Sequence, residues 1–524
     1  MNLKGVIRFL TLILFSVVIG LAVQAIIRRV WPDAFAPVSP PAQTLPQTAQ
    51  TFATTVQEER QRPPQTTVHF APRDAQQSLA VPVVTEVKTD YGTLYFSTRG
   101  GALDRFDYRP AGRAEADIIT PLRSSDKAQE YSFLIALEEQ TPLTYTLTEK
   151  KDEGDATLLT YHATGPTASI IKKFSIDRKV PRITLELTVE PHGKKSVRPR
   201  LFLPAPFVAQ TDQGQQVSGF VYEHQKIKRL KIDEQLANQF WFSSTLPAGA
   251  EDRYFINALV GDPDGFTRRA YFTGKTGDTL HVIFEGPEIT EKKTLTLSFY
   301  CGPKDDTMLS AVDPRLEQAL DYGVWSPLVK LILKILKLIY KHLKNYGVAI
   351  LLLTLLIRIL LIPVTWRGHK ALEKQKEFQR KMRYIEQKYK NDPDALNLER
   401  AELTKKYGLS SMAGCLPHLL ALPIFLALNR LLSTSIELYQ APFFGWITDL
   451  STRDPYYILP FVSGVGMLVQ MLSDTDVKKG VSTFLMVTVF SVITSYFPAG
   501  VVLYLLANTW LSIAQVYIQR KLGA

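Results

Sequence analysis

Six apolar stretches restrict the fold of this chain more than any other feature. They cover residues 9–27, 346–364, 415–434, 456–473, 481–497 and 499–518. At a rise of 1.5 Å per residue, about 17 to 20 helical residues reach roughly 26–30 Å, the thickness of the hydrocarbon core of a bilayer. The sequence therefore predicts a polytopic α-helical membrane protein with six transmembrane helices.

The first apolar stretch has two interpretations. It holds 19 residues without a charge and follows two basic residues, which favours an uncleaved anchor. A secretory signal peptide is the alternative, although the stretch is long for one. Its only small-residue cleavage motif is Val23-Gln24-Ala25.

The charge of the chain is concentrated in its most apolar part. The 524 residues carry a formal net charge of +11. Residues 1–82 contribute +3, residues 83–325 contribute −4 and residues 326–524 contribute +12. Basic residues between long apolar runs are typical of loops that obey the positive-inside rule. A nucleic-acid-binding protein would carry them on a soluble fold instead.

Two segments of different composition follow the first span. Residues 31–82 hold nine prolines and many Gln and Thr, so we expect an extended linker. Residues 83–325 contain short segments in which apolar and polar residues alternate, and these begin at Thr93, Tyr131, Thr157, Arg182, His281 and Thr294. Period-two alternation predicts strands, and so many strands predict one large, exported all-β sandwich.

Two further helical segments are expected outside the spans. Residues 326–345 place lysines 330, 334, 337, 341 and 344 on one helical face opposite an apolar face. This pattern predicts an amphipathic helix in the membrane interface, with a surface helix on the β-domain as the alternative. Residues 366–410 carry 12 basic and 7 acidic side chains around a turn at Asn391-Asp392-Pro393-Asp394, which predicts a helical hairpin.

Placing this basic hairpin in the cytoplasm fixes the topology. Both termini then lie in the cytoplasm, and the β-domain lies outside. The predicted segments are 1–30 (N-terminal transmembrane anchor), 31–82 (linker), 83–325 (β-sandwich domain), 326–345 (amphipathic interfacial helix), 346–365 (second transmembrane helix), 366–410 (cytoplasmic helical hairpin) and 411–524 (transmembrane helices three to six with a short cytoplasmic tail).

Arg358 is the most informative residue of the predicted spans. It lies about six residues before the expected cytoplasmic end of the second span, near Pro363. An arginine at the bilayer centre costs about 2.5–3.5 kcal/mol, so it should face protein or water, and we expect a water-filled cavity. Snorkelling is the alternative, because six helical residues cover about 9 Å, a distance that a long side chain can reach.

The other polar residues of the spans are uncharged or lie near the outer end. Thr354 precedes Arg358 by four residues and shares its face, although a membrane threonine often bonds its own helix backbone. Further uncharged polar groups are His418, Asn429, Gln470, Asn508 and Gln515. We expect no buried acid beside Arg358 and find no internal repeat, which disfavours an ion-coupled transporter.

The sequence contains no conventional catalytic or metal-binding motif. It holds no CxxC, HExxH, P-loop or GxSxG pattern, so we expect no catalytic residue, no metal and no cofactor. Two cysteines, Cys301 and Cys415, cannot build a disulfide framework, and we expect both to be free thiols.

Four segments carry a resemblance to a known family. They are NYGVAILLLTLLIRILLIPVT from Asn345, AGCLPHLLALPIFLAL from Ala413, SIELYQAPFFGWITDLSTRDPYYILP from Ser435 and FPAGVVLYLL from Phe497. In order and spacing they resemble the YidC family of membrane protein insertases. The anchor and the β-domain are similar to the Gram-negative form, mostly through TRGGALDR near Thr98.

The resemblance implies a five-helix core around a hydrophilic groove that opens to the cytoplasm and to lipid. It implies that Arg358 is the groove arginine, that Thr354 lines the groove beside it, and that Tyr504 lies on a substrate-contacting face. Asn508 and Gln470 are assigned to the same substrate groove as polar residues of the later spans.

The implied function is a membrane protein insertase and chaperone, not an enzyme, in the bacterial inner membrane. It would move nascent membrane proteins from the cytoplasm into the bilayer, alone or with the Sec translocon, with the β-domain in the periplasm. The ribosome and the signal recognition particle receptor are further implied partners, and no specific nucleic acid is expected. The alternatives are a small-solute transporter or channel, or an envelope scaffold acting through the β-domain.

Overall fold

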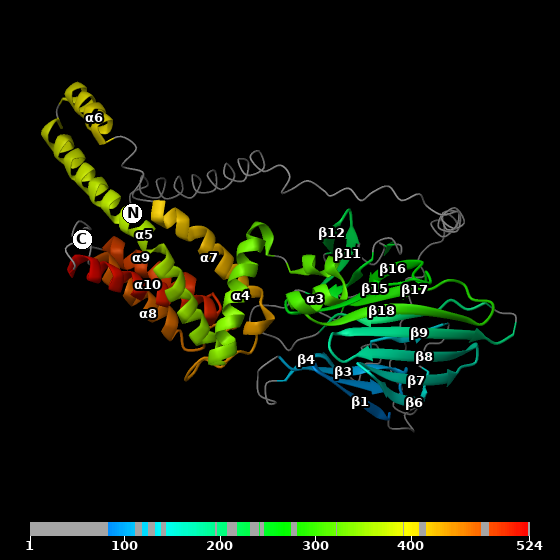
Figure 1. Ribbon diagram of the computed structural model, residues 1–524. Helices are drawn as coiled ribbons and strands as arrows, with labels where there is room; N and C mark the ends of the chain where they lie inside the picture. The colour runs from blue at the N-terminus through cyan, green and yellow to red at the C-terminus, as the bar shows by residue number, and fades with distance from the viewer. Residues whose placement is uncertain are drawn as a thin grey trace. The chain divides into compact units, whose positions relative to one another are not determined.

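The computed structural model in Figure 1 describes most of the chain after residue 81. The described ranges are 82–110, 118–123, 132–137, 143–193, 196–206, 217–230, 240–241, 246–273, 280–320, 322–390, 392–407, 416–472 and 481–521. The predicted anchor, nearly all of the linker and Cys415 lie outside these residues.

The first part of the described chain consists of strands. They are β1 (Val84–Thr89), β2 (Gly92–Ser97), β3 (Ala102–Tyr108), β4 (Ile119–Arg123), β5 (Leu134–Ala136), β6 (Thr146–Glu153), β7 (Ala156–Thr164), β8 (Ala168–Asp177), β9 (Arg182–Pro191), β10 (Arg200–Pro204), β11 (Ser218–Glu223), β12 (Lys226–Leu230), β13 (Phe240–Trp241), β14 (Ala248–Glu251), β15 (Phe255–Gly261), β16 (Arg269–Thr273), β17 (His281–Glu285) and β18 (Lys293–Pro303). The all-β prediction for this region is confirmed, because each of the six alternating segments overlaps one of these strands.

The strands form three antiparallel sheets around a common core. Their orders are β1-β2-β3-β4, β13-β16-β17-β10-β5 and β12-β11-β14-β15-β18-β9-β8-β7-β6. Strands β6 to β9 and β18 lie side by side in Figure 1. One apolar cluster joins buried side chains of all three sheets, among them Leu94, Leu187 and Leu201. Burial of this shared face is the main stabilising contribution that the alternating pattern encodes.

One inward position of β8 holds a lysine instead of an apolar residue. Burial alternates strictly along this strand, and Lys172 is fully buried while Lys173 is not. The Lys172 ammonium donates to the carbonyl oxygens of Gly100 at 2.6 Å, Gly101 at 3.2 Å and Phe133 at 2.7 Å. Three acceptors match the three N–H donors of an ammonium group, so its burial is compensated by hydrogen bonds.

These contacts explain the glycine pair of the TRGG motif. Gly100 and Gly101 have φ angles of +72° and +49°, which glycine adopts without strain. A Cβ atom at Gly100 would lie 2.2 Å from Leu134, and one at Gly101 would lie 2.8 Å from the ring of Tyr145. The turn therefore needs glycine for its backbone conformation and for the space that neighbouring side chains fill.

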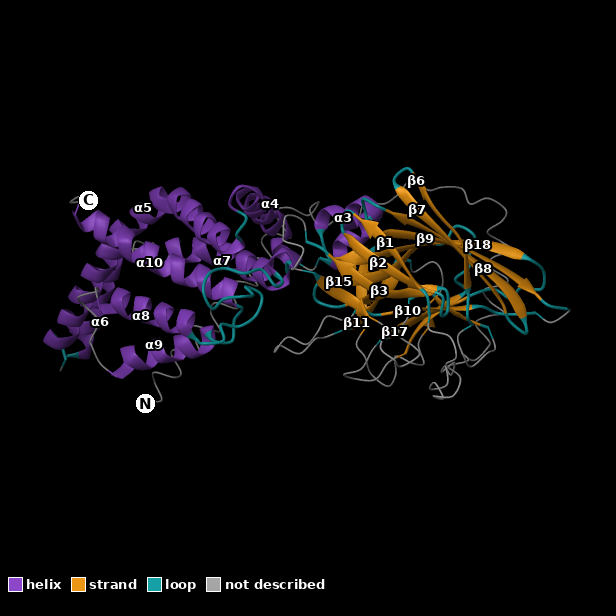
Figure 2. Ribbon diagram, turned by 90° about the horizontal axis from the view of Figure 1, so that it is seen from below, coloured by secondary structure: helices purple, strands orange, loops and turns teal. Residues whose placement is uncertain are grey.

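Helices follow the last strand, and Figure 2 shows them in purple. They are α3 (Asp306–Val312), η5 (Pro314–Ala319), η6 (Gly323–Trp325), α4 (Ser326–Leu343), α5 (Tyr346–Lys388), α6 (Pro393–Tyr407), α7 (Leu416–Thr434), η9 (Ile436–Leu438), α8 (Ile458–Leu472), α9 (Val481–Thr494) and α10 (Ala499–Lys521). Helix α10 packs against α5 and α8, α8 packs against α9, and α4 packs against α5 and α7.

Among the described residues, one helical segment meets a length and composition test for a membrane span. It is Ala499–Ile518, with a mean hydropathy of 1.6. Tyr346–Ile362, Ile458–Met471 and Phe484–Thr494 are shorter apolar helical segments. Helix α5 runs without a break to Lys388, so the second predicted span and the first part of the predicted hairpin form one continuous helix. A proline removes one helical hydrogen bond, and a long helix can continue beyond it.

Two of the five lysines on the charged face of α4 form ion pairs with acidic residues. Lys330 pairs with Asp306 and Glu317, and Lys337 pairs with Asp305 and Glu437 at 2.8 Å each. The remaining three lysines of that face are exposed. The sequence pattern did not anticipate the ion pairs, because their partners lie in other segments of the chain.

The Lys337 cluster is partly removed from water. Burial alone would raise the pKa of the Asp305 carboxyl, but attraction to Lys337 and hydrogen bonds from Lys337 and Thr307 hold this pKa below its ordinary value. Burial raises the pKa of Glu437 although the same ammonium opposes the shift. One lysine thus holds two carboxylates and connects α4 to α3 and η9.

Candidate functional site

Arg358 lies on α5, where it makes its hydrogen bonds to α10. Its Nε donates to Asn508 Oδ1 at 3.0 Å, and its Nη2 donates to the main-chain oxygen of Asn508 at 2.9 Å. Its Nη1 donates to Gln515 Oε1 at 3.3 Å. The guanidinium is therefore fixed by neutral oxygens, and it is neither fully buried nor fully exposed.

The partners of Arg358 belong to a polar stripe along α10. Asn508, Ser512 and Gln515 recur at spacings of four and three residues, which places them on one helical face. Gln470 on α8 reaches the same stripe, because its Nε2 lies 3.4 Å from Ser512 Oγ. Polar side chains of α5 and α8 thus contact the same face of α10.

Thr354 and Tyr504 lie one helical turn before Arg358 and Asn508. The Thr354 hydroxyl donates to the carbonyl oxygen of Ile350 at 2.7 Å, and Thr354 is 1% exposed. The Tyr504 ring stacks on Phe425 with a centroid distance of 6.3 Å and is also buried. Both residues therefore border the polar region on its apolar side.

Of the five predicted site residues, the structure joins Arg358 and Asn508 by hydrogen bonds. Gln470 is bonded to Ser512, which shares a face of α10 with Asn508. The sequence did not single out Ser512 and Gln515 as partners. Their i+4 and i+7 spacing from Asn508 was the available signal. It is weak alone, because a membrane helix often carries small polar residues that face other helices.

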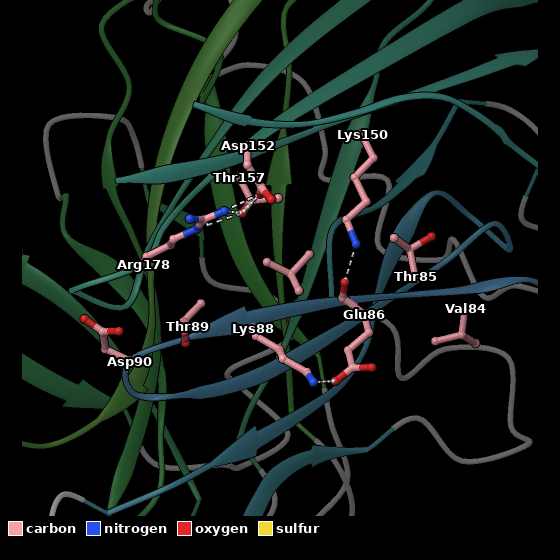
Figure 3. A pocket seen from close by; sticks show the side chains of 11 residues that line it. Val84, Thr85, Glu86, Lys88, Thr89, Asp90, Lys150, Asp152, Thr157 and Arg178 are labelled. Carbon is pink, nitrogen blue, oxygen red and sulfur yellow. Dashed lines mark hydrogen bonds and ion pairs between the residues drawn. The ribbon is translucent and has the colours of Figure 1, made fainter. Parts of the chain in front are cut away.

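A second polar concavity lies in the β-domain, between the outer strands of two sheets. Figure 3 shows its lining, which comes mainly from β1 and includes Lys150 and Asp152 of β6. The cleft measures about 770 Å³. Arg178 pairs with Asp152, and Lys150 donates to the carbonyl oxygen of Glu86 at 2.8 Å. Charged side chains along outer strands commonly prevent pairing with other sheets, which explains this cleft without a ligand.

The described residues contain no group of three or more His, Cys, Asp or Glu side chains that could hold a metal ion. Cys301 is a free, buried cysteine. Burial raises the pKa of its thiol, which is the opposite of what a nucleophilic cysteine requires.

The fold and the polar region together define a class of protein. A large all-β domain is followed by apolar helices, and Arg358 of one of these helices has amide partners on a neighbouring helix. This arrangement belongs to helical membrane proteins that handle polar groups within the bilayer.

Comparison with known proteins identifies the family. Residues 84–335 match the model described as "YidC periplasmic domain", and residues 338–523 match "60Kd inner membrane protein". The "Membrane protein insertase YidC" of Citrifermentans bemidjiense is 30% identical over 463 residues, which cover 83% of this chain and 85% of that protein. The protein of the same description from Geotalea daltonii is 31% identical and covers 84% and 87% of the two chains.

A solved structure is also similar. It is described as an "Active YidC insertase crystal structure with the first transmembrane domain resolved", with 19% identity and a TM-score of 0.35 over 84% of this chain and 95% of that chain.

The chain belongs to the YidC family of membrane protein insertases. It is an inner-membrane insertase with a periplasmic all-β domain and a helical insertase core, and it is not an enzyme.

Proposed function

We propose that Arg358, Asn508 and Gln470, bordered by Thr354 and Tyr504, form one wall of a hydrophilic groove. The polar flank of a nascent membrane protein crosses the bilayer along this wall. The hydrogen bonds that join Arg358 of α5 to α10 carry the proposal, because they place a cation and several polar groups among apolar helices.

The groove acts by shortening the path through hydrocarbon. A charged side chain at the bilayer centre costs about 2.5–3.5 kcal/mol, and water held by a polar wall reduces that cost. The apolar segment of the substrate then moves sideways into lipid. Its burial, at about 25 cal/mol per Å² of apolar surface, drives the step without a nucleotide. The membrane potential adds about 2.3 kcal/mol per charge for each 100 mV.

The finer topology and the partners belong to the same proposal. Six spans, including the stretch at 9–27, place both termini and the hairpin of α5 and α6 in the cytoplasm. The basic composition of residues 366–410 supports this orientation. The hairpin receives emerging chains, with the ribosome, the signal recognition particle receptor and the Sec translocon as further partners.

Reconstitution tests the groove. Purified protein in liposomes should insert a short single-span substrate with a small acidic outer flank faster than protein-free liposomes do. Arg358→Lys, which keeps the positive charge, should retain more insertion than Arg358→Ala, because a cation attracts the acidic flank. Equal rates for the two variants would mean that Arg358 only snorkels, and no insertion by the unmodified protein would refute the function of the groove.

A further inference from the structure

The partners of Arg358 have a chemical property that bears on substrate choice. They are two amides and one main-chain carbonyl, so the cation is bound without being neutralised. A carboxylate at either amide position would cancel the positive charge in place. The local charge therefore depends on the identity of residues 508 and 515 as well as on Arg358 itself.

The orientation of the Asn508 amide follows from the same bonds. A guanidinium has only donors, so the amide must turn its oxygen toward Arg358 and its NH₂ group away. Asn508 contributes both its side-chain oxygen and its main-chain oxygen. Asn508 therefore holds the guanidinium through two of its nitrogen atoms, Nε and Nη2.

The hydrogen-bonding groups that Arg358 and the Asn508 side-chain amide have left over are all donors. Three of the five guanidinium N–H donors are used, and within the described residues two have no protein partner. The Asn508 NH₂ group adds further donors beside them. A positively charged group of donors binds carboxylates and carbonyl oxygens and repels ammonium and guanidinium groups.

We propose that Asn508, assisted by Gln515, positions Arg358 and sets substrate specificity, keeping an uncompensated, donor-only cation that selects substrates with acidic flanking residues. This inference rests on the proposed groove. It goes beyond that groove by assigning the charge selectivity to two neutral side chains. Any acid introduced among them should abolish the preference even though Arg358 is still present.

The decisive variant is Asn508→Asp. It keeps the shape of the side chain and the oxygen that binds Arg358, but it adds one negative charge. Two single-span substrates are compared in liposomes that contain the full-length protein, one with two Asp residues in its outer flank and one with two Asn residues there. The initial insertion rates give an acidic-to-neutral ratio for each variant.

The unmodified protein should prefer the acidic flank, and Asn508→Asp should lower the ratio about tenfold, the equivalent of one charge-assisted hydrogen bond. Gln225→Glu is the matched control, because Gln225 is exposed in the turn between β11 and β12 and the change adds the same charge. Its ratio should equal that of the unmodified protein. Gln515→Glu adds the same charge at the second amide partner of Arg358. It tests the assignment of charge selectivity if Asn508→Asp does not fold.

The outcomes separate the two proposals. If the unmodified protein inserts neither substrate, the groove proposal fails. If it inserts both and Asn508→Asp retains the acidic preference, only the assignment of selectivity to Asn508 fails. If Asn508→Asp and Gln515→Glu each lower the insertion rates of the acidic and the neutral substrate equally, the assignment of selectivity also fails. The two residues would then have only a structural role.

Discussion

Lys172→Met should open the TRGG turn of the periplasmic domain. The change removes an ammonium that binds three carbonyl oxygens at 2.6, 3.2 and 2.7 Å and lies 4.7 Å from the centre of the Tyr145 ring. Methionine has a similar length and fits the apolar surroundings, so little packing is lost. The three carbonyl groups would be left without this donor.

The size of the effect follows from opposing contributions. A buried polar group without its partner costs about 1–3 kcal/mol, so three carbonyls would cost roughly 3–9 kcal/mol. The methionine avoids the desolvation penalty of an ammonium, which is several kcal/mol. We expect a net loss of about 3 kcal/mol, which raises the opening equilibrium constant of the turn about 100-fold.

Hydrogen exchange of the full-length protein measures this opening locally. The amides of Gly101, Leu103 and Tyr145 are bonded in or beside the turn and report on it. Lys173→Met is the control, because its side chain points outward and is 44% exposed beside Glu186. Protection in Lys172→Met equal to that of the control would show that the three carbonyls find other donors and that the reasoning is wrong.

Two further predictions concern other buried charges. Burial raises the pKa of Asp252 to about 6 although hydrogen bonds from two main-chain N–H groups oppose the shift. The folded state then keeps a proton that the unfolded state releases, so stability should fall by about 2 kcal/mol as the pH rises from 4 to 6, and Asp252→Asn should remove this dependence in denaturant titrations. Lys337→Met should leave two carboxylates without their cation and weaken hydrogen-exchange protection of residues 435–439 at least tenfold. The exposed Lys334→Met should leave it unchanged, and equal effects of the two lysine variants would contradict the ion-pair account.

Local pattern was enough to predict six of the described strands and most of the helices. Period-two alternation in β7 and β9 reflects one buried face, and that signal depends only on neighbouring residues. Helix α4 follows the same logic with a period of 3.6 residues. Local rules did not show that the second span and the first part of the hairpin form the single helix α5, because a proline within the run reads as a probable helix boundary.

The sequence by itself determined the class of the protein, since long apolar stretches predict membrane spans and the motifs from Asn345 onward are specific to a family. It also singled out Arg358, because a cation within an apolar run is costly wherever it lies. Only the tertiary structure decided which residues bind each charge. The partners of Arg358 are 150 and 157 residues away, and one partner of Lys172 is 72 residues away. Hydrogen bonds over such separations depend on how the helices and sheets pack, and no local periodicity encodes them.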